Sequence, residues 1–206
     1  MIWVVIIIAA AVVLLLLILV GMFNKLVRLR NRAENAWAQV DVQLRKRYDL
    51  IPNLVETVKG YAAHERETFE AVTQARTAAQ QAQGVAQQAQ AENALTAAIG
   101  RLFAVAEAYP QLRATENFQQ LQAQLADTEN QIQVARQVYN DTVLTYHNAI
   151  QTFPGMLLAG PFGFTKREFF EVEDEAQREA PSVDFGTSQP PPAAAAEPPT
   201  PPEAGS

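Results

Sequence analysis

The sequence has no cysteine and few histidines, the residues most often used in nucleophilic catalysis and in transition-metal binding. Its 206 residues include no cysteine and only two histidines, so disulfides, thiolate metal sites and lipids attached through a thiol are excluded. His64 and His147 both lie outside any metal-ligand spacing, and there is no glycine-rich phosphate loop or nucleophile elbow. We therefore expect no catalytic residue, no metal, no cofactor and no small-molecule substrate, and we interpret the protein as a non-enzyme.

The chain also lacks an overall excess of basic residues. It has 16 Lys and Arg against 22 Asp and Glu, a net charge of -6. Positive charge is concentrated in residues 25–47, which hold seven basic residues against Glu34 and Asp41. Nucleic-acid binding needs a broad basic face, so we expect no nucleic-acid partner. A basic cluster directly after an apolar run is instead expected to meet an anionic lipid surface.

The one long apolar run is at the N-terminus. Residues 2–20 carry no charge, and as a helix they would rise about 28 Å, close to the roughly 30 Å hydrocarbon core of a bilayer. A cleaved signal peptide is the alternative, but the start is not basic and residues 20–23 form a poor cleavage site. Trp3 and Phe23 flank the run where interfacial aromatic residues belong. We therefore expect residues 1–21 to form a transmembrane anchor integral to the lipid bilayer.

Basic residues follow this anchor and none precedes it. The bases nearest its C-terminal side are Lys25, Arg28, Arg30 and Arg32, and they are candidates for contact with the lipid surface. By the positive-inside rule, we expect the N-terminus to lie outside and the body in the cytoplasm.

Helical spacing of apolar residues runs through residues 22–172, and a proline-rich tail follows in residues 173–206. We predict an all-α fold, in which the transmembrane helix continues into an antiparallel bundle of about four helices. The first helix should reach about Ala62, with a kink or a restart near Pro52. The others should span about residues 64–84, 91–108 and 118–153. Eight prolines in residues 181–206 predict a disordered tail.

The last of these helices has the clearest pattern, with apolar residues at alternating steps of three and four. Thr115 is expected to cap its start. Protein partners, or a second copy of the chain, could pack on its seam. The predicted seam residues are Phe118, Leu121, Leu125, Thr128, Ile132, Ala135, Tyr139, Thr142, Tyr146, Ala149 and Phe153.

Four further stretches of the sequence allow specific expectations. Residues 154–164 either cover the end of the bundle or dock into the lipid interface through Phe162 and Phe164. Residues 45–47 are basic and are expected to be a solvated helix face rather than a phosphate site. His64, with Glu65 and Glu67, is expected to cap a helix start and to form a solvated charged face rather than to act chemically. Residues 77–98, rich in Ala and Gln, should be helical, bury little and be the least stable part of the body.

Two long blocks resemble the LemA family. They are LVRLRNRAENAWAQVDVQLRKRYDLIPNLVETVKGYAAHE, residues 26–65, and YPQLRATENFQQLQAQLADTENQIQVARQVYNDTVLTYHNAIQTFP, residues 109–154. The resemblance implies a bacterial single-span protein of the inner membrane, with antiparallel helices and no established enzymatic activity. One member of the family takes part in building magnetosome membranes. The matching positions that we treat as interaction candidates are Arg30, Asn31, Trp37, Asp41, Arg47, Asp49, Pro52, Asn53, Glu65, Arg136 and Tyr139.

Three functional hypotheses follow, of which an enzyme using His64 or His147 is set aside because no converging polar groups of a catalytic pocket are recognisable. A membrane-anchored scaffold or adaptor fits a single anchor, a long helical body and the absence of a recognisable catalytic site. A membrane-remodelling or envelope-stress protein fits the juxtamembrane bases and the apolar loop at residues 154–164.

Overall fold

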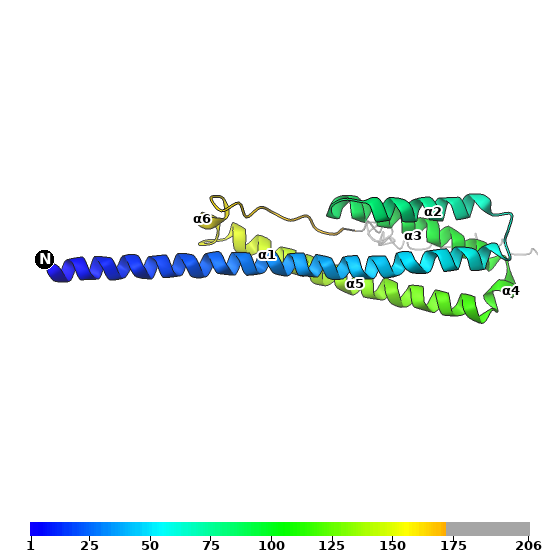
Figure 1. Cartoon of the computed structure of the whole chain (residues 1–206), viewed down its shortest axis with the longest axis horizontal. Coiled ribbons are helices and arrows are strands. Elements are labelled where there is room, and N and C mark those ends of the chain that lie inside the picture. Colours follow the sequence, from blue (N-terminus) through cyan, green and yellow to red (C-terminus); the bar gives the residue numbers. More distant parts are fainter. Residues whose placement is uncertain (172–206) are drawn as a thin grey trace, which may run out of the picture. The chain divides into compact units, whose positions relative to one another are not determined.

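A computed structural model describes residues 1–171 of the chain, so the predicted tail and Val172 lie outside the described residues. The predicted all-α fold is confirmed, because residues 1–171 form helices and their connections and no strand. The helices are α1 (Ile2–Lys59), α2 (Arg66–Gln81), α3 (Val85–Glu107), α4 (Pro110–Arg113), α5 (Glu116–Gln151) and α6 (Met156–Ala159) (Figure 1).

Helix α1 joins the apolar N-terminal run to the body without a break (Figure 1). Residues 2–18 are exposed, whereas the buried stripe begins at Leu26 and continues to Val58. In residues 1–171, α1 is the one helix that is long and apolar enough to cross a membrane. The unburied part therefore has the length and surface of a span, and the buried part belongs to the helical body.

The expected restart at Pro52 is wrong, because α1 continues through this residue. Proline has no N–H, so the Tyr48 carbonyl four residues earlier loses its helical donor. Arg76 of α2 supplies a replacement, with its Nε 2.8 Å from the Tyr48 oxygen. A side chain from a neighbouring helix thus satisfies the carbonyl that proline leaves free.

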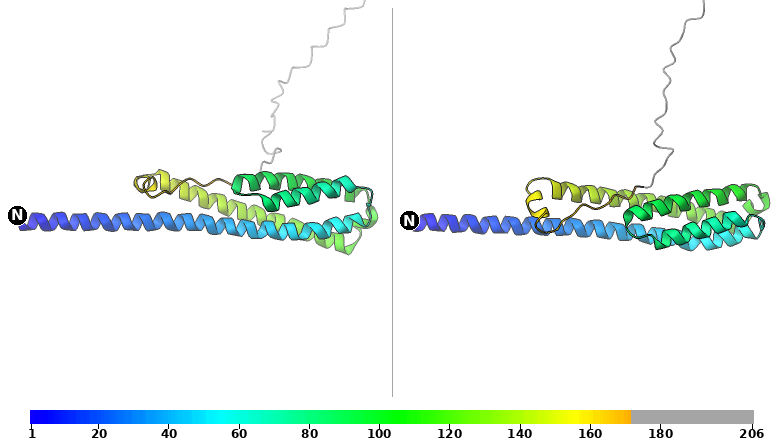
Figure 2. Two further views of the ribbon diagram at one scale, coloured as in Figure 1. Left: turned by 45° about the horizontal axis from the view of Figure 1, so that its top comes forward. Right: turned by 90° about the horizontal axis from the view of Figure 1, so that it is seen from above.

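Helix α5 runs back along α1, and these two helices share the largest interface of the body (Figure 2). The predicted seam is correct in its first half and drifts in its second half. Val143 and Ile150 are buried where Thr142 and Ala149 were expected, and Phe153 is exposed. An ideal helix drifts by about 20° per heptad from a strict seven-residue repeat, which accounts for this shift over five heptads.

Helices α2 and α3 form a hairpin that packs on α1 (Figure 2). The expectation that residues 77–98 bury little is wrong for α3, where Ala89, Glu92 and Leu95 are buried. Their spacing of three residues places them on one face of the helix. The turn is at residues 82–84, so α2 ends earlier and α3 begins earlier than predicted. Gly84 has a φ of 81°, a conformation that side chains other than glycine rarely adopt.

Thr115 precedes α5, but its hydroxyl does not cap that helix. It donates to the Leu112 carbonyl of α4 at 2.7 Å. Glu65 precedes α2 and makes no side-chain cap either, and the adjacent His64 is exposed. Both predicted caps are therefore wrong, although the two helices begin close to the predicted residues.

A double-mutant cycle tests whether Arg76 replaces the helical hydrogen bond that Pro52 removes. Arg76→Met should lower the free energy of unfolding of the full chain in detergent by about 1–3 kcal/mol, because it leaves a part-buried carbonyl without a donor. In a Pro52→Ala background, the new alanine offers its own N–H to the Tyr48 carbonyl, so the same change should cost much less. Chemical unfolding followed by circular dichroism measures both. An equal cost in the two backgrounds would show that Arg76 has a different role.

Candidate functional site

Helices α1, α3 and α5 are joined by a buried ionic network around Arg47. Arg47 is 4% exposed, and one of its terminal nitrogens lies 3.1 Å from a carboxylate oxygen of Glu92, which is 2% exposed. The other nitrogen donates to the Thr96 hydroxyl at 2.9 Å and lies 3.3 Å from Glu129. The expectation of a solvated basic face is therefore wrong for Arg47 and holds for its neighbours Arg45 and Lys46, which are exposed.

Tyr48 and Gln88 complete the hydrogen bonding of Glu92. The Tyr48 hydroxyl donates to the Glu92 carboxylate, and the Gln88 amide donates to both the Glu92 carboxylate and the Tyr48 oxygen, at 3.0 and 2.8 Å. Burial raises the pKa of Glu92, while its partners Tyr48, Arg47 and Gln88 act in the opposite direction. Burial and the bond to Glu92 also raise the pKa of Tyr48.

The charged groups of this network pair with one another, although the Arg47 Nε is buried without a hydrogen-bond partner among residues 1–171. Removing one partner of such a buried pair would leave a costly unpaired charge. Among residues 1–171, no three His, Asp or Glu side chains converge in a way that could hold a metal ion. Sequence reasoning missed Glu92, although its three-residue spacing from Ala89 and Leu95 was a usable signal.

A strap of extended chain, residues 164–171, lies along α5. The hydroxyls of Tyr139 and Tyr146 donate to the carbonyls of Glu168 and Thr165 at 2.8 and 3.0 Å. The Asn140 side chain bonds both the N–H and the carbonyl of Phe170. Three residues of α5 thus fix the path of the strap by binding its backbone.

Trp37 packs between the strap and α5. Its ring centroid lies 5.2 Å from that of Tyr139 and 5.4 Å from that of Phe170, which is fully buried. Such tilted and edge-on contacts are favourable arrangements for aromatic pairs. Two interaction candidates, Trp37 and Tyr139, therefore meet in one packing cluster.

His147 holds the same strap by a hydrogen bond that depends on protonation. Its Nε2 accepts the backbone N–H of Arg167 at 2.9 Å, so this nitrogen carries no proton. Burial lowers the pKa of His147, and the positive charge of Lys166 acts in the same direction. Arg167 also forms an ion pair with Glu34 on α1.

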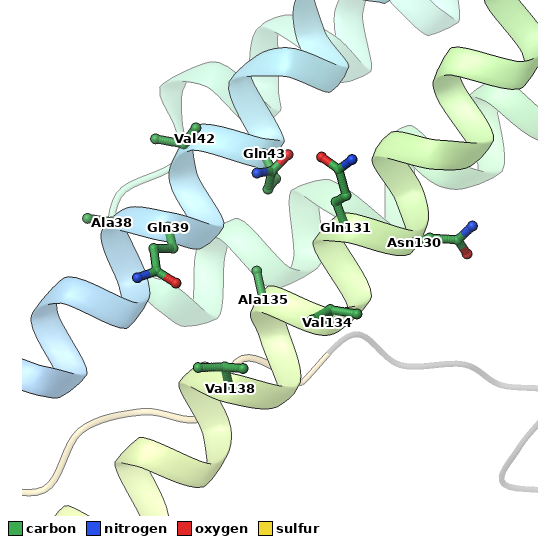
Figure 3. Close-up of a pocket in the computed structure, with 9 residues that line it drawn as sticks. All are labelled: Ala38, Gln39, Val42, Gln43, Asn130, Gln131, Val134, Ala135 and Val138. Atoms are coloured by element: carbon green, nitrogen blue, oxygen red, sulfur yellow. The ribbon is translucent and has the colours of Figure 1, made fainter.

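An apolar groove lies between α1 and α5, and Figure 3 shows it with α2 and α3 in the background. It has a volume of about 590 Å³. Val42, Val134 and Val138 are 61%, 63% and 46% exposed. None of the lining residues is charged: they are Ala38, Gln39, Val42, Gln43, Asn130, Gln131, Val134, Ala135 and Val138.

The lipid-surface candidates gather where α5 and α6 meet α1. Lys25, Arg28 and Arg32 are exposed on α1. Phe162 is 56% exposed, but Phe164 is only 6% exposed and packs against Phe23, with the Arg30 guanidinium 5.5 Å from its ring centre. Phe164 is therefore a support of the loop and not a side chain free to enter lipid.

The remaining candidates are not brought together into one site. Asn31, Asp49 and Asn53 are exposed at separate points of α1, and Pro52 is exposed within it. Asp41 pairs with Arg45 one turn away at 2.8 Å. Glu65 lies beside the start of α2, and Arg136 is half-buried on α5.

Comparison with known proteins matches the sequence to one family. The sequence model of the LemA family matches residues 36–185, which include the Arg47 and Trp37 clusters. The chain belongs to the LemA family. It is 25% identical to "Magnetosome protein MamQ" of Magnetospirillum gryphiswaldense over 74% of this chain and 65% of that protein. This LemA-family chain therefore spans slightly less than two thirds of that relative.

Two further relatives agree with this assignment. "Magnetosome protein MamQ 2" of Paramagnetospirillum magneticum is 24% identical, over 74% of this chain and 66% of that protein. "Protein LemA" of Metamycoplasma hominis is 23% identical, over 84% of this chain and 77% of that protein. At these identities, the relatives support the family and say nothing of individual side-chain roles.

The His147 bond makes strap attachment sensitive to acid. The pKa of His147 in the folded chain is below its ordinary value of 6.5. Its bond therefore stabilises the fold fully above pH 6.5, and this stabilisation is lost as the pH falls through the lower pKa of the folded chain. The melting temperature of the full chain in detergent should therefore drop on acidification from about pH 7 to pH 5.5, by an amount equivalent to about 1 kcal/mol.

His147→Gln keeps an acceptor without a titrating ring, so it should reduce this drop. The exposed His64→Gln is the matched control and should leave it unchanged. Glu92, whose pKa is raised, contributes stability of the opposite pH dependence, and this contribution is the same in all three proteins. A drop of equal size in the wild type and in His147→Gln would exclude His147 as its source.

Proposed function

We propose that this LemA-family protein is a membrane-anchored helical scaffold without catalytic activity that assembles with further copies through the α1–α5 groove. The observation that carries the proposal is the groove itself, an uncharged surface with three half- to two-thirds-exposed valines on neighbouring helices. Exposed apolar surface of this kind marks interaction sites in folded proteins.

The anchor favours a second copy as the occupant. Val42 follows the apolar run on the same helix, about 33 Å of helical rise beyond Val20. Copies anchored in one bilayer therefore present their grooves at the same height and with α1 pointing the same way. A twofold axis along the membrane normal then brings two identical grooves together, and confinement to the membrane raises their effective concentration.

The polar lining of the groove fits such a contact. Gln39 and Asn130 are exposed in this lining, so their amides are free to form hydrogen bonds with a second copy. Contact between two copies would also remove the apolar surface of the valines from water, and this burial favours association.

We propose a bacterial inner-membrane location, with the body in the cytoplasm. The support is the basic side chains that follow the apolar run, where cytoplasmic flanks carry Lys and Arg. Groove assembly does not depend on this orientation, because both copies share it.

Membrane remodelling through lipid-surface contacts is the second candidate function. It is supported by the exposed apolar and basic side chains at the membrane-proximal end of the body. The MamQ relatives are named as magnetosome proteins, which is consistent with a membrane role. Remodelling predicts a change in vesicle shape, which scaffolding alone does not.

The scaffold proposal is tested by placing like charges in the groove. The full chain in detergent or nanodiscs should be larger than a monomer by analytical ultracentrifugation. Val134→Glu with Val138→Glu should make it monomeric, because the four carboxylates of a pair would face one another without water. Leu144→Glu is the matched control, since Leu144 is also on α5 and 51% exposed but does not line the groove.

Cross-linking gives a second readout, because the chain has no native cysteine. A single cysteine at Val134 should form a disulfide dimer in vesicles, and one at the exposed Gln122, about 120° around α5, should not. A monomeric wild type, or a dimer that survives the two glutamates, would overturn the proposal.

A further inference from the structure

The loop and short helix that follow α5 lie beside the end of the apolar run of α1 (Figure 1). This segment carries an exposed apolar patch. Phe153, Met156, Leu157 and Phe162 are 75%, 54%, 59% and 56% exposed. We define these four residues as the apolar patch. Folded proteins rarely leave so many large apolar side chains together in water without a binding role.

The patch is held by packing on its inner side. Leu158, Ala159 and Phe164 are buried in a small core with Leu26 and Ile150. In the same segment, the backbone of Gly155 packs closely against the end of α5. A Cβ atom on this residue would lie 2.0 Å from the Ala149 carbonyl oxygen. The exposed side chains therefore project from a fixed support rather than from a loose loop.

The position of the patch along α1 identifies its surroundings. The Phe162 ring contacts Phe23 at a centroid distance of 5.1 Å. Phe23 is three residues beyond Val20, a rise of about 4.5 Å past the uncharged run. When that run crosses a bilayer, the patch lies at the depth of the headgroups, where Phe and Leu are favoured.

The charge at this end of the body fits the same surroundings. Residues 1–33 and 142–167 contain no Asp or Glu. Lys25, Arg28, Arg32 and Lys166 are exposed there, and Glu34 is paired with Arg167. An apolar patch in segments that carry bases and no acids is complementary to a membrane surface with anionic lipid.

We propose that the apolar patch is a second, interfacial membrane anchor, which inserts Phe153, Met156, Leu157 and Phe162 into the headgroup region of the bilayer that α1 crosses. The exposed bases of the same end bind anionic headgroups. Two contacts on one rigid body fix the tilt of the bundle against the membrane, which one helix alone would not do. The anchor is independent of assembly through the groove.

The test measures lipid contact at Leu157 in the full chain. A bimane probe on a single cysteine at Leu157 is reconstituted into phosphatidylcholine vesicles containing phosphatidylglycerol. Lipids brominated high in the acyl chain should quench it, and its emission should be blue-shifted. A probe at the exposed Gln122, on the far part of α5, is the control and should be unquenched. Solvent-like, unquenched emission at Leu157 would overturn the proposal.

Substitutions separate the patch from general proximity to the membrane. Phe153→Ser with Phe162→Ser should reduce quenching at Leu157 by about twofold, because half of the patch is lost. Val134→Ser with Val138→Ser removes the same number of exposed apolar residues from the groove and should change nothing. Equal quenching in all three proteins would show that the patch side chains do not insert.

Lipid composition tests the role of the bases, and vesicle shape separates the interfacial anchor from membrane remodelling. Omitting phosphatidylglycerol should weaken quenching, and no change would overturn the role of the bases. Quenching in vesicles of unchanged shape supports the interfacial anchor while counting against membrane remodelling. Quenching that persists in the monomeric Val134→Glu, Val138→Glu variant shows that the anchor does not require the assembled scaffold.

Discussion

The other elements of the structure depend on helix α1. This helix contains the apolar run, and it forms one side of the main helix–helix interfaces of the body. Helices α2, α3 and α5 all contact it, and the α6 core closes on its residues next to the run. Its continuity through Pro52 needs the donor that Arg76 provides from α2. The hairpin that packs on α1 thus also maintains the backbone hydrogen bonding of α1.

The buried Arg47–Glu92 pair fixes where the hairpin sits on α1. Removing two charges from water is costly, and apolar side chains of similar volume would often give equal or greater stability. The pair, however, is satisfied only when α3 lies in the register that also brings Thr96 and Gln88 to it. We infer that the network contributes positional specificity to this apolar interface, in addition to the packing of its apolar side chains.

Helix type and order were predictable because they follow from periodic burial, which each helix carries in its own sequence. The seam of α5 was predicted to within one residue up to Ile150 but not at Phe153, which is exposed, and its drift reflects the mismatch between 3.6 and 3.5 residues per turn. What could not be predicted depended on contacts between distant segments. Arg47 looked solvated because Glu92, its partner, is 45 residues away in a stretch with few large side chains. Arg76 and His147 act on backbone groups of other segments, which no local pattern reveals.

A distance measurement along α1 tests the account most directly, since both the groove and the apolar patch take their height above the bilayer from this helix. Spin labels at Asn24 and Glu56, both exposed, are 32 residues apart and lie on nearly the same face. Double electron–electron resonance on the full chain in nanodiscs, diluted with an excess of unlabelled chain so that assembled copies add no distances, should give a narrow distribution near about 48 Å. A broad distribution, or one centred well below that distance, would show that the apolar run and the body are not joined by one continuous helix.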